Sequence, residues 1–250
     1  MENNGHVLAF MAHPDDIEIL CAGVLIRLRQ KGYTIHMATM TAGDGGSMEL
    51  PGEEIARIRS QEAKKAAELV PADYHCAGQK DFLVRYHPSA IRKTVEIIRL
   101  CQPFLVITHS PVDYLLDHEN TSQLVRNACF GAGAPNMKTN AVPAAPVLPG
   151  IPYLYYANPI ENKDNWGQPV VPDRIYDISS EMDQKEAMLK CHASQRDWVL
   201  QHHGIDVVDN MRRWSGWLGK RIGASYGEGF RQHLGHAYPQ DDKLWELLNS

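Results

Sequence analysis

The chain has 250 residues, of which 25 are basic and 30 acidic, so its formal net charge is −5. This length suffices for one large hydrophobic core, and we expect a single domain over residues 1–250. The charge balance leaves no excess of cations to bind a nucleic-acid backbone or an anionic membrane surface, so neither is an expected partner.

The cysteines and the amino-terminal sequence indicate in which cellular compartment the protein resides. The five cysteines are odd in number, form no CxxC pair and are too scattered for a disulfide scaffold, which favours a reducing environment. The opening MENNGHVLAF has no basic region followed by a long apolar stretch, and no later segment approaches about eighteen uncharged apolar residues. We therefore expect a cytoplasmic protein without a membrane span.

The first half of the sequence alternates apolar, β-branched runs with segments of helical periodicity. Strands are predicted over residues 6–12, 34–41, 73–78 and 104–109. Helices are predicted over residues 18–32, 53–70, 88–102 and 119–130. This alternation is typical of an α/β fold, a Rossmann-like three-layer sandwich with a mostly parallel sheet, whose ligand crevice lies beyond the carboxyl ends of the strands.

The second half is harder to assign. Residues 131–152 are rich in Pro, Gly and Ala, which predicts no regular element. Further strands are expected over 152–158 and 174–179, and a helix with a serine cap over 180–196. We expect the last residues, about 200–250, to form a tail that packs on the body or on a neighbouring subunit.

The segment AHPDD follows the first predicted strand and carries three ligand-type side chains. His13 and Asp16, three residues apart at a strand-to-helix turn, can point toward one metal ion. Asp15 would then stand beside the ion and could take a proton from a metal-bound water. The alternative is a simple turn, in which Pro14 fixes φ and an aspartate caps the next helix.

A third ligand would complete a site with one open position. His118 is the best candidate because it lies beyond the buried strand 104–109, and Asp117 could support His118 as a neighbour of the ligand. The alternative for His118 is a structural role at the start of the helix that follows.

The strand, AHPDD, helix and later strand ending near Asp-His resemble the LmbE-like, or PIG-L, family of zinc-dependent N-deacetylases, which act mainly on N-acetylglucosamine-type sugars. The resemblance extends to the glycine-rich segment 39–47, the Arg-x-x-Glu-Ala helix 56–70, the region 111–130 and the helix 185–195. It covers about residues 5–200. It implies one Zn²⁺ per chain, or another divalent ion such as Fe²⁺, and a homo-oligomer.

The resemblance also assigns roles to single residues. It implies that His13, Asp16 and His118 bind the metal and that Asp15 is the general base. Weaker substrate contacts are implied for Arg59, Asp44 and Asp81. From the residues alone, Arg59 could equally be a helix-face arginine and Asp44 a turn aspartate.

One position departs from the pattern. Much of the family has HPDH where this chain has LLDH, so the first histidine, thought to act as general acid, is Leu115. Three explanations stay open: Asp15 serves as both base and acid, another side chain reaches in, or ordinary turnover has been lost. The candidates for such a side chain are Tyr114, His109, His202 and His203.

The expected function is hydrolysis of an N-acyl, chiefly acetyl, group on an aminosugar or its conjugate. The alternative is a non-catalytic metal- or sugar-binding protein, motivated by Leu115. Dinucleotide binding is disfavoured because AHPDD occupies the place that a Gly-x-Gly-x-x-Gly fingerprint requires. We expect segments 131–152 and 211–239 to shape the substrate pocket, and four aromatic residues of the tail suit a subunit interface or the core: Trp214, Trp217, Tyr226 and Phe230.

Overall fold

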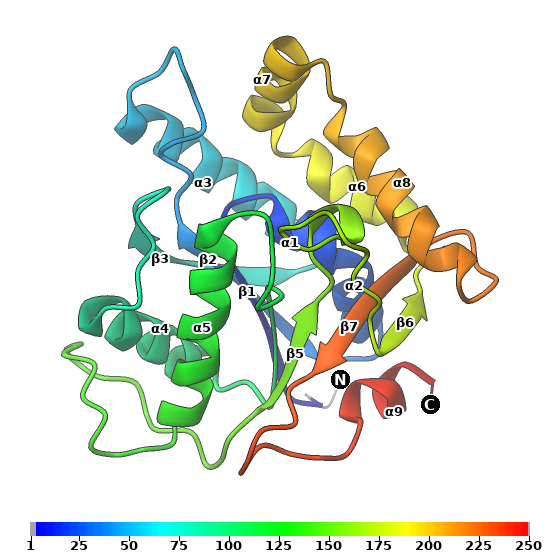
Figure 1. Ribbon diagram of the computed structural model, residues 1–250. Coiled ribbons are helices and arrows are strands. Elements are labelled where there is room, and N and C mark those ends of the chain that lie inside the picture. The colour runs from blue at the N-terminus through cyan, green and yellow to red at the C-terminus, as the bar shows by residue number, and fades with distance from the viewer. Residues whose placement is uncertain (1–3, 250) are drawn as a thin grey trace.

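The computed structural model describes residues 4–249; residues 1–3 and 250 of the predicted domain lie outside the described residues. At its centre is a seven-stranded sheet with the order β3-β2-β1-β4-β5-β7-β6 (Figure 1). The strands are β1 (His6–Met11), β2 (Thr34–Thr41), β3 (Ala72–Gln79), β4 (Leu105–Thr108), β5 (Tyr153–Ala157), β6 (Arg174–Asp177) and β7 (Gly227–Gln232). The first five in the sheet order are parallel, whereas β7 runs antiparallel to both β5 and β6.

Helices cover both faces of the sheet. The helices are α1 (Asp16–Leu20), α2 (Ala22–Gln30), α3 (Gly52–Glu68), α4 (Pro88–Cys101), α5 (Leu116–Gly131), α6 (Met182–Lys190), α7 (Ala193–His203), α8 (Val207–Lys220) and α9 (Lys243–Asn249), with a 3₁₀ turn at Ile160–Asn162. Alternate residues of β1 face opposite layers. Val7 and Ala9 pack with α1, α2, α6 and α9, whereas Leu8 and Phe10 pack under α4 and α5. The predicted α/β sandwich is confirmed.

The predicted helix over 18–32 is in fact two helices. The chain turns at Cys21 (φ −147°, ψ 5°) between α1 and α2. This turn frees the amides of Gly23 and Val24, which both donate to the buried carboxylate of Glu228 at 2.8 Å. A carboxylate at a helix amino terminus is favoured by the helix dipole, so a remote residue on β7 stabilises the break.

The predicted helix over 180–196 is broken in the same way. It ends at Lys190, and α7 begins at Ala193 with His192 in a non-helical conformation. The backbone N–H and the hydroxyl of Ser194 donate to Glu62 on α3 at 2.8 and 2.6 Å. Here too a carboxylate from a distant segment stabilises the amino terminus of the second helix.

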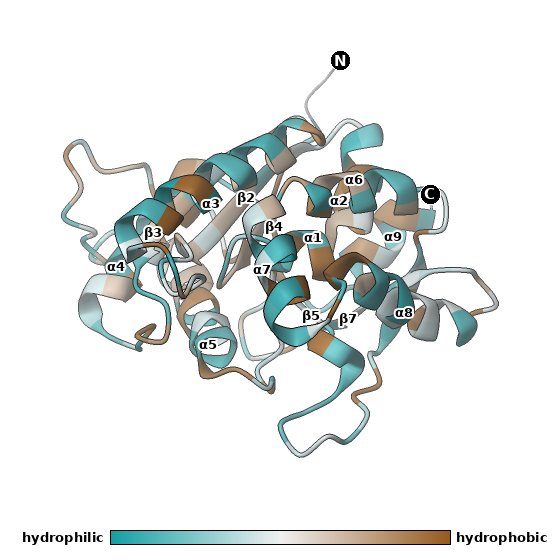
Figure 2. Ribbon diagram, turned by 90° about the horizontal axis from the view of Figure 1, so that it is seen from above, coloured by the Kyte–Doolittle hydropathy of each residue, from teal (hydrophilic) through white to brown (hydrophobic). Residues whose placement is uncertain are grey.

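The carboxyl-terminal residues complete the sheet and its cover. β7 lies between β5 and β6, and Phe230 on β7 is buried in the core, so the suggestion of a subunit interface at Phe230 is wrong. α7 lies between α3 and α8 when the molecule is seen from above (Figure 2), and it contacts both. Within residues 4–249, no helix is both long and apolar enough to cross a membrane.

Candidate active site

The polar segments that follow β1, β2 and β4 meet at one end of the sheet. His13 lies two residues after β1, and His109 directly follows β4. The glycine-rich segment that continues from Thr41 at the end of β2 to residue 47 is called the glycine loop below. In the order β3-β2-β1-β4, strands β2 and β3 are added on one side of β1 and β4 on the other. The point at which the strand order reverses therefore lies between the parallel strands β1 and β4. In open α/β sheets such a switch point is where ligands bind.

Three side chains predicted as metal ligands form a compact triangle. His13 Nδ1 lies 3.2 Å from His118 Nε2 and 3.3 Å from Asp16 Oδ2, and the remaining edge, between His118 Nε2 and Asp16 Oδ2, is 3.5 Å. A tetrahedral ion with ligand bonds of about 2.0–2.1 Å has ligand atoms about 3.3–3.4 Å apart. The triangle therefore has the size of one face of a zinc coordination shell, and its donor set of two imidazoles and a carboxylate fits such an ion.

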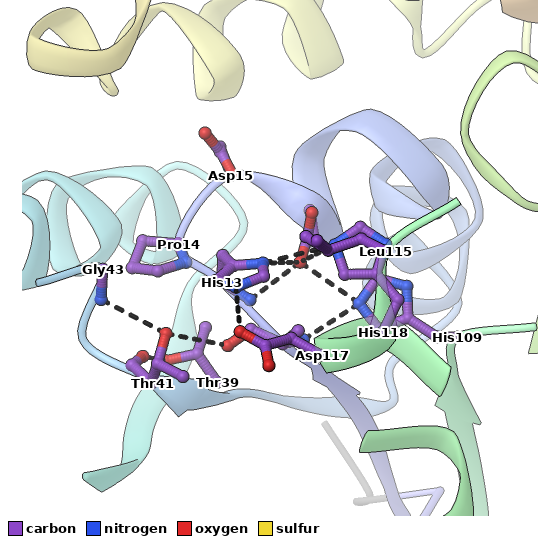
Figure 3. A network of polar contacts seen from close by, with 12 residues as sticks. His13, Pro14, Asp15, Thr39, Thr41, Gly43, His109, Leu115, Asp117 and His118 are labelled. Atoms are coloured by element: carbon purple, nitrogen blue, oxygen red, sulfur yellow. Dashed lines mark hydrogen bonds and ion pairs between the residues drawn. The ribbon is translucent and has the colours of Figure 1, made fainter. Parts of the chain in front are cut away.

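The far nitrogen of each histidine faces a carboxylate. His118 Nδ1 lies 3.0 Å from Asp113 Oδ1. His13 Nε2 lies 3.4 Å from Asp117 Oδ2 (Figure 3). The structure thus places Asp117 beside His13 rather than beside His118, which we had expected it to support. Asp117 and His118 are neighbours on one helix and point in different directions, whereas Asp113 in the preceding turn faces the His118 ring.

His109 lies on the interior side of this triangle and contacts two of its members. Its ring stacks on His118 with centroids 4.0 Å apart, and its Nε2 lies 3.1 Å from Asp16 Oδ2. The same nitrogen accepts the backbone N–H of Ala12 at 2.9 Å. The fully buried His109 is therefore placed to hold the rings and carboxylate in position.

The electrostatics of the cluster favour a cation. Burial opposes a positive charge on His13, but hydrogen bonds with Asp117 and Asp16 outweigh it and raise the pKa of His13 to about 10. Burial also opposes ionisation of Asp16, yet His118 and His109 hold the pKa of its carboxyl well below the usual range. Without an ion, protons occupy this site, so a metal ion must displace them and its affinity falls at low pH.

Asp15 stands apart from the triangle. Its backbone is left-handed (φ 107°), and its side chain caps no helix. Its carboxylate points away from the histidines (Figure 3). Arg59 donates to the Pro14 carbonyl at 2.6 Å and lies 3.4 Å from Asp15 Oδ2. Burial raises the pKa of Asp15 to about 6, although the Arg59 charge favours ionisation. Strained backbone of this kind is common at functional sites.

The glycine loop packs on Arg59 and Asp81. A Cβ on Gly43, whose φ is +77°, would come within 2.5 Å of the Arg59 guanidinium. Asp81 accepts the Gly45 N–H at 2.8 Å. Asp44 accepts the Asp81 N–H at 2.8 Å, pairs with Lys80 at 3.0 Å and does not line the cavity described next. These contacts hold the glycine loop against Arg59 and Asp81.

A cavity of about 670 Å³ opens above the triangle. The predicted site residues that line it are His13, Asp15, Asp16, Arg59, Asp81 and His118. Leu115 and Tyr114 also line it, whereas His202 and His203 do not. Its far wall comes from α7, α8 and the turn between them: Gln195, Trp198, Val199, Ile205, Val207, Asn210 and Trp214. No residue of segment 131–152 lines this cavity, so the expectation that the segment shapes the pocket is wrong.

Asp113, which sequence reasoning missed, provides a test of this arrangement. We expect Asp113→Ala to weaken Zn²⁺ binding by about 10- to 100-fold, because the carboxylate orients His118 and raises its basicity. Asp113→Asn, which keeps an acceptor, should lose less. The measurement is competition with a chelator of known affinity, with the fully exposed Asp183 changed to Asn as control. Unchanged affinity in Asp113→Ala would contradict the role.

The fold and the site define an α/β protein with a candidate mononuclear metal centre at a sheet switch point. A family model described as PIG-L, GlcNAc-PI de-N-acetylase, matches residues 8–129. The resemblance to this family that the sequence predicts is thereby confirmed.

Known relatives include two enzymes of different reaction classes. Diacetylchitobiose deacetylase of Thermococcus kodakarensis is 26% identical over 236 residues, which span 90% of this chain and 82% of the relative. 4-Oxalmesaconate hydratase of Pseudomonas putida is 26% identical over 197 residues, spanning 75% and 73%. Among solved structures, N,N'-diacetylchitobiose deacetylase from Pyrococcus horikoshii has a TM-score of 0.76 at 25% identity, covering 95% of this chain and 88% of that one.

Proposed function

We propose that this chain is a metal-dependent hydrolase that removes an N-acyl group, chiefly acetyl, from an aminosugar or its conjugate. The observation that carries the proposal is the triangle of His13, Asp16 and His118 at the floor of a cavity that Asp15 also lines. The deacetylase relatives favour N-acetylated sugars as the substrate class.

In this proposal His13, Asp16 and His118 hold one Zn²⁺ or a similar divalent ion. When bound, such an ion polarises the amide carbonyl and acidifies water. Asp15 takes a proton from the attacking water and passes it to the departing amine, because Leu115 has no proton to give. The raised pKa of Asp15, about 6, suits a base that must also release its proton near neutral pH.

The walls of the cavity favour a neutral polyol over a polyanion. Five carboxylates line it: Asp15, Asp16, Asp81, Glu161 and Asp164. The positive charges that face them are Arg59, Lys163 and the divalent ion that the triangle holds in this proposal. Carboxylates accept hydrogen bonds from sugar hydroxyls, and Trp198 and Trp214 offer aromatic faces to the apolar face of a sugar ring.

Hydration of a carbon–carbon double bond is the second candidate function. It is favoured by the hydratase relative and by Leu115, because adding water expels no amine, and the proton that the base takes from water can return to the neighbouring carbon. The hydratase relative, however, spans 75% of this chain, whereas the deacetylase of Thermococcus kodakarensis spans 90%. We therefore rank hydrolysis first.

The experiment measures metal content and two activities on one preparation. Acetate release is assayed from a panel of N-acetylaminosugars, and loss of ultraviolet absorption from unsaturated polycarboxylates. Hydrolysis predicts acetate release that Asp16→Ala abolishes, together with the loss of one metal ion per chain. Hydration without acetate release would replace the proposal, and metal without either activity would support a binding protein. Asp16→Ala with full metal content would contradict the ligand set.

A further inference from the structure

A second group of metal-ligating side chains lies far from the candidate active site. His36 on β2, His75 on β3 and Cys101 at the end of α4 each place one ligand atom within 4.8 Å of the other two. His36 precedes Thr41, where the glycine loop starts, by five strand residues, which is about 16 Å along β2. This group therefore belongs to the other end of the sheet.

The sheet's alternation brings these side chains under α4. His36 shares its face of β2 with Ala38 and Met40, which belong to the core beneath α4 and α5, and Cys101 is part of the same core. His36 and Cys101 are both buried, at 7% and 1% exposure. Polar side chains buried in such a place need hydrogen-bond partners.

Two ring nitrogens in the group lack such partners. Among residues 4–249, His36 Nδ1 and His75 Nε2 are buried and have no hydrogen-bond partner. Asp73 Oδ2 lies 3.6 Å from His36 Nδ1, which is too long for a hydrogen bond. Unsatisfied buried groups in a native protein call for an explanation, and an unplaced ion is one.

Binding of a metal ion requires that the imidazoles of His36 and His75 carry no positive charge. Burial, with the neighbouring His75 and His6, lowers the pKa of His36 to about 4, and burial lowers the pKa of His75 as well. Both imidazoles are therefore neutral near pH 7. Burial raises the pKa of the Cys101 thiol to about 12, so an ion bound there must displace one proton from the sulfur.

The surroundings also suit a bound cation. His6 Nδ1 lies 2.8 Å from His36 Nε2, a contact that engages one nitrogen of the His36 ring and leaves Nδ1 as the nitrogen that can bind an ion. A hydrogen-bonded far nitrogen is usual in metal-binding histidines. The Asp73 side chain is 74% exposed beside His36, which gives the group both a path from solvent and a carboxylate near its rim.

We propose that His36, His75 and Cys101 bind a thiophilic divalent cation of the zinc type. Two imidazoles and a thiolate select Zn²⁺ or Co²⁺ over Mg²⁺ or Ca²⁺. Ligand atoms on a tetrahedral ion are about 3.3–3.6 Å apart, so each pair of ligand atoms in this group, now within 4.8 Å, need approach by no more than about 1.5 Å. Asp73 or water supplies the fourth ligand.

Cobalt distinguishes this site from the candidate active site, because only this one contains a thiolate. The reduced protein carrying Asp16→Ala is titrated with Co²⁺. We expect one equivalent to produce a thiolate-to-cobalt charge-transfer band, and Zn²⁺ to remove it. Cys101→Ser should abolish the band, and His75→Asn should weaken Co²⁺ binding by at least about tenfold.

Cys76→Ser is the matched control, since Cys76 neighbours His75 on β3 and points to the opposite face of the strand. It should leave the band unchanged. If Cys101→Ser does not fold, His75→Asn alone tests the site, because His75 is only partly buried. Absence of the band at one equivalent of Co²⁺, or its persistence in Cys101→Ser or at full strength in His75→Asn, would overturn the proposal and leave water as the partner of the two nitrogens.

Discussion

Asp15→Asn is expected to lower kcat for acetate release by about 10²- to 10⁴-fold, the usual contribution of a general base. Metal content should stay at the wild-type value, because Asp15 is not part of the triangle formed by His13, Asp16 and His118. The wild-type rate should also fall at acid pH as one proton binds to Asp15. Burial raises the pKa of Asp15 to about 6, and a bound cation lowers it, so the acid limb lies at pH 6 or below.

The same substitution should stabilise the fold at neutral pH. Because burial raises the pKa of Asp15 in the folded protein above its ordinary value of 3.8, folding favours the protonated carboxyl. The stability from this group is fully present below about pH 4 and is lost as the pH rises through about 6. Asparagine carries no charge, so Asp15→Asn should raise Tm at pH 7 but not at pH 4.

Activity and Tm must therefore move in opposite directions at pH 7. A merely structural role for Asp15 would lower both. Asp183→Asn is the matched control, since the Asp183 side chain is fully exposed and distant from the cavity lining. Wild-type kcat in Asp15→Asn would remove Asp15 from the proposed chemistry, whatever the change in Tm.

The parallel sheet and the ends of its strands were predictable because both follow from local patterns. Buried runs such as residues 104–109 mark strands, and polar residues that directly follow them meet at one edge. These two patterns are enough to predict that His13, Asp16 and His118 meet at one edge of the sheet. Local patterns fail at Cys21 and His192, where helices end although the apolar periodicity continues. The carboxylates that favour those breaks, Glu228 and Glu62, are remote in the sequence.

The supporting residues of the site were less accessible to sequence reasoning. Asp113 lies five residues before His118 in the turn after β4, and no helical or strand period relates the two. A carboxylate upstream of a ligand histidine was the available signal. The cavity wall on α7 and α8 depends on Glu62 holding Ser194, a contact across 132 residues. Such contacts are tertiary, and local sequence does not encode them.

Glu228→Gln is expected to destabilise the protein by about 3–5 kcal/mol, the usual cost of leaving one buried charge unpaired. Glu228 on β7 accepts from Lys185 on α6, and both side chains are almost fully buried. Lys185 also donates to the Ile19 carbonyl on α1 at 2.9 Å. The carboxylate therefore joins β7, α6 and the start of α2, and urea unfolding measures its loss.

Removing both charges should cost less than removing one. In Glu228→Gln with Lys185→Met no charge is stranded, and the glutamine oxygen can still accept from Gly23, so the double variant should be more stable than Glu228→Gln alone. Asp173→Asn breaks the exposed pair with Arg231 and should change stability by less than about 1 kcal/mol. If Glu228→Gln costs no more than Asp173→Asn, the buried pair does not hold β7 to the helices, and the break at Cys21 needs another cause.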